Sequence, residues 1–202
     1  MDIPTGRLIA IGGAEDKGTE SEGHYREHSN LHFFELGILK RVNQEMGSDG
    51  HIEVITTASS IPSEVAENYL QAFRKVGNEN VGVLNIRNRD DARKPEFIAR
   101  IKSARGIMFS GGDQLRLTTI FGGTEFLDIL HDRYMHDGLV IAGTSAGAMA
   151  MSNTMIYQGK SDLAHLKGEV KITTGLAFMK DVIIDSHFDK RGRFNRLAQA
   201  VA

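Results

Sequence analysis

The chain has 202 residues, a length that fits one α/β domain of ordinary size. It carries 24 lysines and arginines against 26 aspartates and glutamates, and a net charge of −2 provides no general positive field for nucleic acid or an anionic membrane. It has no cysteine, which excludes disulfides, thiolate metal sites and a cysteine nucleophile. No apolar run is long enough to cross a membrane, so we expect a soluble and most simply cytoplasmic chain.

Short apolar runs alternate with amphipathic stretches, the pattern of a mostly parallel sheet with helices on both faces. We expect strands at Leu8 to Ile11, Ile52 to Thr57, Val81 to Ile86, Gly106 to Phe109, Leu139 to Ala142 and Val182 to Ile184. Helices are expected at Leu31 to Met46, at Pro62 to Val76 and after Pro95, with Gly47 and Gly77 ending the first two. The pattern predicts one α/β domain over residues 1–202. Because a helical pattern is still running at Ala202, we expect the fold to be incomplete at its C-terminus.

The most informative loop is Gly143-Thr144-Ser145-Ala146-Gly147, which joins an apolar strand to a stretch of small residues. Gly-x-Ser-x-Gly in this context predicts a nucleophile elbow, because small neighbours let the strand and the helix pass closely beside a strained serine. The Ser145 Oγ would then lie at a helix N-terminus, where backbone donors favour negative charge. Ser145 is the candidate nucleophile, and a coincidental glycine turn is the alternative.

A second glycine loop, Ser110-Gly111-Gly112-Asp113-Gln114, also joins a strand to a helix. Its glycines let the backbone approach a ligand, and an N–H here could complete an oxyanion hole with that of Ala146. Asp113 is equally well explained as a helix N-cap, and Gln114 as a surface residue of the first turn. A phosphate-binding loop is not expected, since no Gly-Lys-Ser/Thr follows.

The histidine of Asp185-Ser186-His187 follows the strand expected at residues 182–184. A histidine at this strand end would reach the same rim as Ser145, and it is the side chain best matched to accepting a serine proton near neutral pH. Asp162 lies between the two in the chain and is the candidate acid that would orient the imidazole, with Glu169 and Asp185 as alternatives.

Three arginines follow within six residues: Arg191, Arg193 and Arg196. Such a cluster suits the capture of carboxylates and indicates an anionic substrate, although a solvated helix start also explains it.

A metal site is weakly indicated by His24, His28 and His32, which would share one face of a helix. Their charged surroundings favour a solvated loop, so we expect neither a metal nor another cofactor.

Four segments occur in an order that spans nearly the whole chain: Ile11 to Lys17, Ser110 to Gln114, Gly143 to Ala148 and Asp185 to Phe188. Together they resemble the cyanophycinases, serine peptidases related to aspartyl dipeptidase. The resemblance implies a three-layer, flavodoxin-like α/β/α fold similar to the class I glutamine amidotransferases.

The resemblance also implies roles for individual residues. Ser145 matches the nucleophile, His187 matches the base, and the third member falls at Ser161 and Asp162, where the family usually has glutamate. Gly112 and Ala146 match the oxyanion hole. The positions that match the substrate pocket are Gln114, Asp185, Arg193 and Arg196.

The activity implied by the resemblance is release of β-Asp-Arg dipeptides from the end of cyanophycin, a poly-aspartate chain with arginine on each β-carboxyl. The arginines near His187 would hold the aspartyl carboxylate, and Asp113 or Asp185 would receive the substrate's arginine. A homodimer is implied as well.

Ser186 departs from the family pattern, which commonly has glutamine beside the catalytic histidine. This leaves room for an isoaspartyl or α-aspartyl dipeptidase. A non-catalytic peptide-binding module on the same fold is the alternative from another class. An amidotransferase is not expected, because that chemistry usually relies on a cysteine.

Overall fold

The central feature is a parallel sheet of five strands. The computed structural model describes residues 3–13, 37–47, 49–159, 169–187 and 193–201. The strands of the sheet are β1 (Arg7–Ile11), β2 (Ile52–Ile55), β3 (Val81–Leu84), β4 (Gly106–Phe109) and β5 (Val140–Thr144). Their order in space is β1-β5-β4-β2-β3, and every neighbouring pair is parallel. The carboxyl ends of β1, β5 and β4 therefore lie side by side, and the loops after them share one rim.

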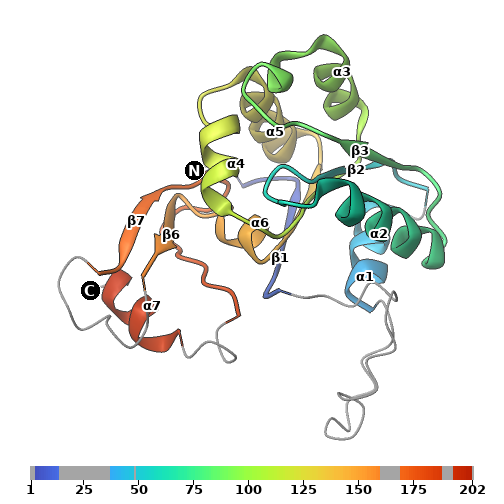
Figure 1. Cartoon of the computed structure of the whole chain (residues 1–202). Helices are drawn as coiled ribbons and strands as arrows, with labels where there is room; N and C mark the ends of the chain where they lie inside the picture. Colours follow the sequence, from blue (N-terminus) through green and yellow to red (C-terminus); the bar gives the residue numbers. More distant parts are fainter. Residues whose placement is uncertain (1–2, 14–36, 48, 160–168, 188–192, 202) are drawn as a thin grey trace, which may run out of the picture.

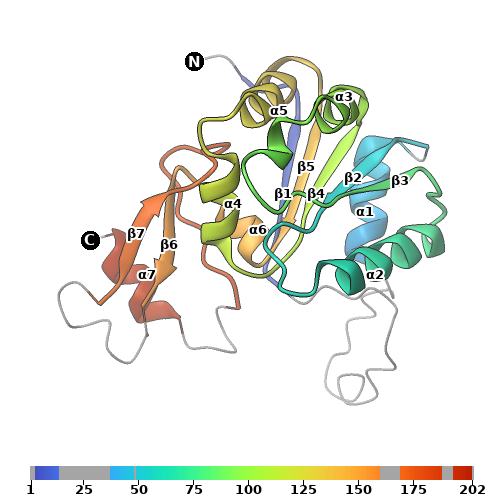
Figure 2. The same cartoon turned by 45° about the horizontal axis from the view of Figure 1, so that its top comes forward.

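Helices cover both faces of this sheet, as Figures 1 and 2 show. One face is covered by α1 (Gly37–Met46) and α2 (Pro62–Lys75). The other is covered by α3 (Pro95–Ser103), α4 (Gln114–Phe121), α5 (Glu125–His136) and the short α6 (Ala146–Met149), with a 3-10 turn, η1 (Asp91–Arg93), before α3. Alternate residues of β4 serve the two cores, since Met108 packs against the first pair of helices, and Ile107 and Phe109 pack against the second group. The expected three-layer α/β/α class is confirmed.

Local sequence signals account for several helix boundaries. Pro62 and Pro95 occupy the first positions of α2 and α3, where the missing N–H has no helical partner to lose. Gly47 and Gly77 follow α1 and α2 with φ angles of 85° and 87°, the left-handed conformation expected of a residue that ends a helix.

The strand expected at Val182 to Ile184 is a wrong prediction: the structure assigns no strand there. Ile183 and Ile184 are half-buried against the core, but the N–H of Ile184 donates to the Ser152 side chain rather than to a neighbouring strand. The apolar run at residues 182–184 therefore reflects partial burial of Ile183 and Ile184 and not membership of a sheet.

An antiparallel pair of strands stands beside the main sheet. It consists of β6 (Thr154–Gln158) and β7 (Lys171–Thr174), with α7 (Phe194–Val201) next to it (Figure 1). The half-buried Leu197 and Ala200 of α7 pack against the larger core cluster. Among the described residues, no helix is both long enough and apolar enough to span a membrane.

One charged group is buried within the sheet. The side chain of Glu53, on β2, is fully buried and pairs with Arg100 of α3, whose Nε donates to it over 2.7 Å. Gly82 of β3 leaves the space for this pair, because an added Cβ there would overlap both side chains. The ion pair ties α3 to the centre of the sheet.

Candidate active site

Ser145 occupies a sharp turn between β5 and α6. Its φ of 50° and ψ of −108° lie outside the regions that L-residues ordinarily adopt, a conformation that costs about 1–3 kcal/mol. The flanking glycines are needed for close passage: a Cβ on Gly143 would lie 2.6 Å from the Gly147 carbonyl carbon, and one on Gly147 would lie 2.8 Å from the Phe109 Cβ. The local geometry is that of the predicted elbow.

His187 lies within hydrogen-bond distance of this serine. Its Nε2 is 3.0 Å from the Ser145 Oγ, although 42 residues separate the two in sequence. The end of β1 supports both residues, since Ser145 donates its N–H to the carbonyl of Ile11 and His187 donates its N–H to the carbonyl of Gly12. A neutral imidazole placed in this way can accept the hydroxyl proton of the serine.

Gly13 lies directly against the imidazole. Its φ is 128°, and a Cβ added there would be 2.5 Å from the His187 Nε2. The sequence analysis includes Gly13 in the motif Ile11 to Lys17 but does not predict its contact with His187. The signal for it is a pair of glycines directly after a strand, which is typical of close approach to the backbone.

Ser186 places a second hydroxyl beside that of Ser145. It is buried, with 2% of its surface exposed, and its Oγ lies 3.4 Å from the Ser145 Oγ. The same Oγ donates a hydrogen bond to the Met149 sulfur over 3.2 Å. The residue that departs from the family pattern is therefore next to the Ser145 hydroxyl.

The second glycine loop packs against the elbow. A Cβ on Gly111 would lie 3.5 Å from the Ser145 Cβ, so the loop and the serine are in van der Waals range. Gly112 has a φ of 140° and is pressed against the carbonyl of Ala58, which accepts the N–H of Asp113 over 3.0 Å. Within the described part of the chain, the N–H groups of Gly112 and Ala146 have no hydrogen-bond acceptor. Both remain able to donate to a ligand.

Asp113 and Gln114 have structural partners. The Asp113 carboxylate accepts the N–H of Leu115 over 2.9 Å and caps α4, which confirms the N-cap interpretation. The Gln114 side chain donates to the carbonyl of Ile156 over 3.0 Å and joins α4 to β6. Their roles toward a substrate stay predictions.

Asp185 is paired with two of the three arginines that follow His187, Arg193 and Arg196. Its side chain is fully buried and accepts from Arg193 over 3.1 Å and from the Arg196 Nε over 2.9 Å. Arg193 also donates to the Ser186 carbonyl over 2.7 Å, and Arg196 donates to the Gly159 carbonyl over 3.2 Å. These contacts fasten the segment that carries His187 to α7. Asp185, Arg193 and Arg196, three of the five residues expected to bind substrate, thus form one cluster around a buried carboxylate.

Several predicted residues lie outside the described part of the chain: Asp162, Ser161, Arg191, His24, His28 and His32. Glu169 is described and half-buried, and Asp185 is ion-paired as above. Among the described residues, no group of histidines and carboxylates is arranged to hold a metal ion.

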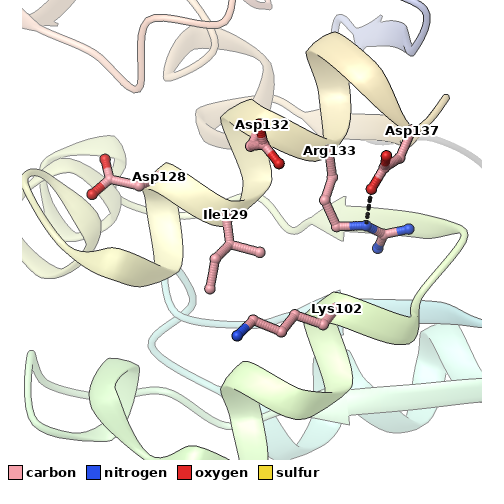
Figure 3. Close-up of a pocket in the computed structure, with 6 residues that line it drawn as sticks. All are labelled: Lys102, Asp128, Ile129, Asp132, Arg133 and Asp137. Atoms are coloured by element: carbon pink, nitrogen blue, oxygen red, sulfur yellow. Dashed lines mark hydrogen bonds and ion pairs between the residues drawn. The ribbon is translucent and has the colours of Figure 1, made fainter.

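A separate hollow lies between α3 and α5 (Figure 3). Its lining consists of Lys102, Asp128, Ile129, Asp132, Arg133 and Asp137. Arg133 is used structurally, because it donates to the carbonyl of Ile101 and pairs with Asp137. Of its lining residues, Lys102, Arg133 and Asp137 lie near the C-terminal ends of α3 and α5, which precede β4 and β5, whereas Ser145 follows β5.

A strained serine after a central parallel strand, with a histidine 3.0 Å from its hydroxyl, defines the site of a serine hydrolase on an α/β/α fold. Comparison with known families is in agreement: Peptidase family S51 matches residues 19–202. The chain belongs to this peptidase family.

Curated relatives agree with the family. The chain is 35% identical over 195 residues to the cyanophycinase of Trichormus variabilis, covering 96% of this chain and 61% of the relative. It is 35% identical over 198 residues to the cyanophycinase of Synechococcus elongatus, covering 98% and 57% respectively. The chain therefore spans about three fifths of the length of these relatives.

Solved structures show the same fold. A peptidase from an acI-B1 Actinobacterium superposes with a TM-score of 0.69 at 23% identity, over 98% of this chain and 76% of that one. A putative peptidase E protein from Listeria monocytogenes gives 0.60 at 15% identity, over 96% and 87%.

Proposed function

We propose that this protein is a serine exopeptidase that hydrolyses cyanophycin to β-Asp-Arg dipeptides. The observation that carries the proposal is the 3.0 Å separation between the Ser145 Oγ and the His187 Nε2 on a strained elbow. Membership of peptidase family S51 and the similarity to cyanophycinases supply the class of substrate.

In the proposed reaction, Ser145 attacks the scissile carbonyl while His187 takes its proton and passes it to the leaving amine. The N–H groups of Gly112 and Ala146 stabilise the negative charge on the carbonyl oxygen, because they are preorganised and have no described acceptor of their own. A water molecule, activated by His187, then hydrolyses the acyl-enzyme. Asp162 is proposed to orient the imidazole.

Recognition of the aspartyl carboxylate is assigned to the cluster of Arg193, Arg196 and Asp185. Two guanidiniums meet one buried carboxylate beside the segment of His187, and guanidinium groups suit the capture of a carboxylate. Gln114 and Asp113 are proposed to contact the arginine of the substrate from the neighbouring loop. The resemblance to cyanophycinases further supports a single hydrolytic domain acting as a cytoplasmic homodimer.

The test is release of β-Asp-Arg from purified cyanophycin by the full-length protein, with Ser145→Ala as the matched control. We expect release by the parent protein and none by the variant, with the fold of the variant preserved in its circular dichroism. Normal turnover by Ser145→Ala would overturn the proposal.

Two alternatives are separated in the same experiment. Cleavage of α-Asp-Arg but not of the β-linked polymer would assign the protein to the aspartyl dipeptidases. Peptide binding without labelling of Ser145 by a fluorophosphonate would identify a non-catalytic binding module.

A further inference from the structure

Two guanidinium groups lie next to each other on the rim that carries Ser145. Arg87 follows β3, and Arg116 lies in the first turn of α4. Both donate to the carbonyl oxygen of Ser59, Arg87 over 3.0 Å and Arg116 over 3.3 Å. Since both side chains reach the same atom, the two positive charges are immediate neighbours.

Within the described residues, no ion pair involves either guanidinium: the nearby Asp91 carboxylate accepts the backbone N–H of Arg87 over 2.9 Å and pairs with Lys94. Neither guanidinium has a carboxylate within ion-pair distance, in contrast to Arg100, Arg193 and Arg196, which each pair with a buried carboxylate. Burial, followed by the positive charge of Arg116, lowers the pKa of Arg87. Two neighbouring like charges repel each other, so a bound anion would relieve the repulsion.

Arg87 and Arg116 lie next to the glycine loop of residues 110–114, which contains the proposed oxyanion donor Gly112. Arg87 also donates to the carbonyl of Thr56, so it holds the segment that leaves β2. Ala58, in this segment, packs against Gly112 and accepts the N–H of Asp113. In Figure 2 this segment runs between β2 and α2, at the end of the sheet where α6 begins. Ligands of open α/β sheets bind at this edge.

We propose that Arg87 and Arg116 form a carboxylate subsite for the part of the substrate beyond the dipeptide that is released. The inference rests on the proposed function, because each unit of that polymer carries the free α-carboxylate of its arginine. Guanidinium groups bind carboxylates through paired hydrogen bonds, and two of them side by side suit a substrate with repeated carboxylates. The subsite favours longer chains over short peptides.

The experiment measures kcat/KM of the full-length protein for two synthetic β-Asp-Arg tetramers and compares the two values. One tetramer has free arginine carboxylates, and the other has them amidated everywhere except in the dipeptide that is released. For the parent protein, we expect amidation to lower kcat/KM about fivefold, mainly through KM, as for a partly screened ion pair. In Arg116→Gln and in Arg87→Gln, amidation should change kcat/KM less than twofold. Arg74→Gln, an exposed arginine of α2, is the matched control and should discriminate like the parent protein.

The comparison separates ligand binding from a structural role. If the arginines only hold the loop through Ser59, both variants lose activity toward both tetramers equally, and the ratio between the tetramers stays at the parent value. That result, or a parent protein that does not discriminate, would overturn the subsite. If no tetramer is cleaved, the proposed function fails instead. In that case, calorimetry measures the Kd of each tetramer for Ser145→Ala and for Ser145→Ala combined with Arg116→Gln. The subsite is supported if the ratio of the two Kd values differs between these proteins, and it is overturned if the ratio is the same.

Discussion

The contact between Gly13 and His187 predicts a large loss of activity from a single methyl group. A Cβ at residue 13 would lie 2.5 Å from the His187 Nε2, whereas ordinary contacts begin at 3.4 Å, so the ring must move by about 1 Å. The hydrogen bond to Ser145, now 3.0 Å long, would be lost. A misplacement of this size costs about 100-fold in rate. Alanine at a φ of 128° adds roughly 1–3 kcal/mol of backbone strain.

The assay is kcat/KM for β-Asp-Arg release by Gly13→Ala, together with the rate at which a fluorophosphonate labels Ser145. The matched control is Gly12→Ala, because a Cβ on Gly12 would have nothing within 4 Å and the carbonyl that accepts from His187 remains. We expect the control to stay within about twofold of the parent protein. Circular dichroism and urea unfolding establish that both variants are folded. Full activity in a folded Gly13→Ala protein, or an equal loss in Gly12→Ala, would refute the argument.

Three further predictions concern contacts around the site and in the core. Ser186→Ala should lower kcat about twofold to fivefold at constant KM, because the Ser145 hydroxyl loses a neighbouring polar partner; steady-state kinetics measures this, and an altered KM alone would contradict it. Arg100→Met should lower the free energy of unfolding in urea by about 3 kcal/mol, because it removes the guanidinium from the buried Glu53 carboxylate, which keeps its 2.7 Å contact with the His51 Nε2. Adding Glu53→Gln should recover much of the loss. Burial lowers the pKa of His131, whose Nε2 contacts the Leu176 carbonyl. The neutral ring therefore stabilises the fold at a pH above 6.5, the ordinary pKa of histidine. This stabilisation is lost as the pH falls from 6.5 through the lower pKa of the folded state. His131→Gln, which can still donate to Leu176, should therefore show a smaller fall in its urea midpoint between pH 7.5 and pH 5.5, and equal falls in the two proteins would rule this out.

Local sequence patterns were sufficient for the central sheet. Its five strands are short, mostly apolar runs, and the helices α2 and α3 begin at prolines, so short-range signals define them. The elbow at Ser145 was predictable for the same reason, because a close crossing of strand and helix requires small residues at fixed spacing.

Contacts between distant segments were not predictable in this way. The sequence analysis did not predict the strands β6 and β7. These two strands pair with each other across an intervening segment and with a shift in register, which no local pattern indicates. The apolar run at residues 182–184 was taken for a strand, because hydrophobicity reports burial but not a partner in the sheet. The pairing of Asp185 with Arg193 and Arg196 depends on where α7 packs, and the contact of Gly13 with His187 joins the two ends of the described chain.

The support of Ser145 and His187 by Ile11 and Gly12 has a consequence for how the site tolerates change. The two residues are held by carbonyl groups of successive peptide units, and the spacing of such units is set by covalent geometry. Substitutions in the cores on either side of the sheet can therefore weaken folding without altering the separation of the Ser145 and His187 side chains. An insertion or deletion of one residue at the end of β1 would instead shift one support relative to the other. We expect Gly12 to accept other side chains, whereas the backbone at the end of β1 accepts no change in length.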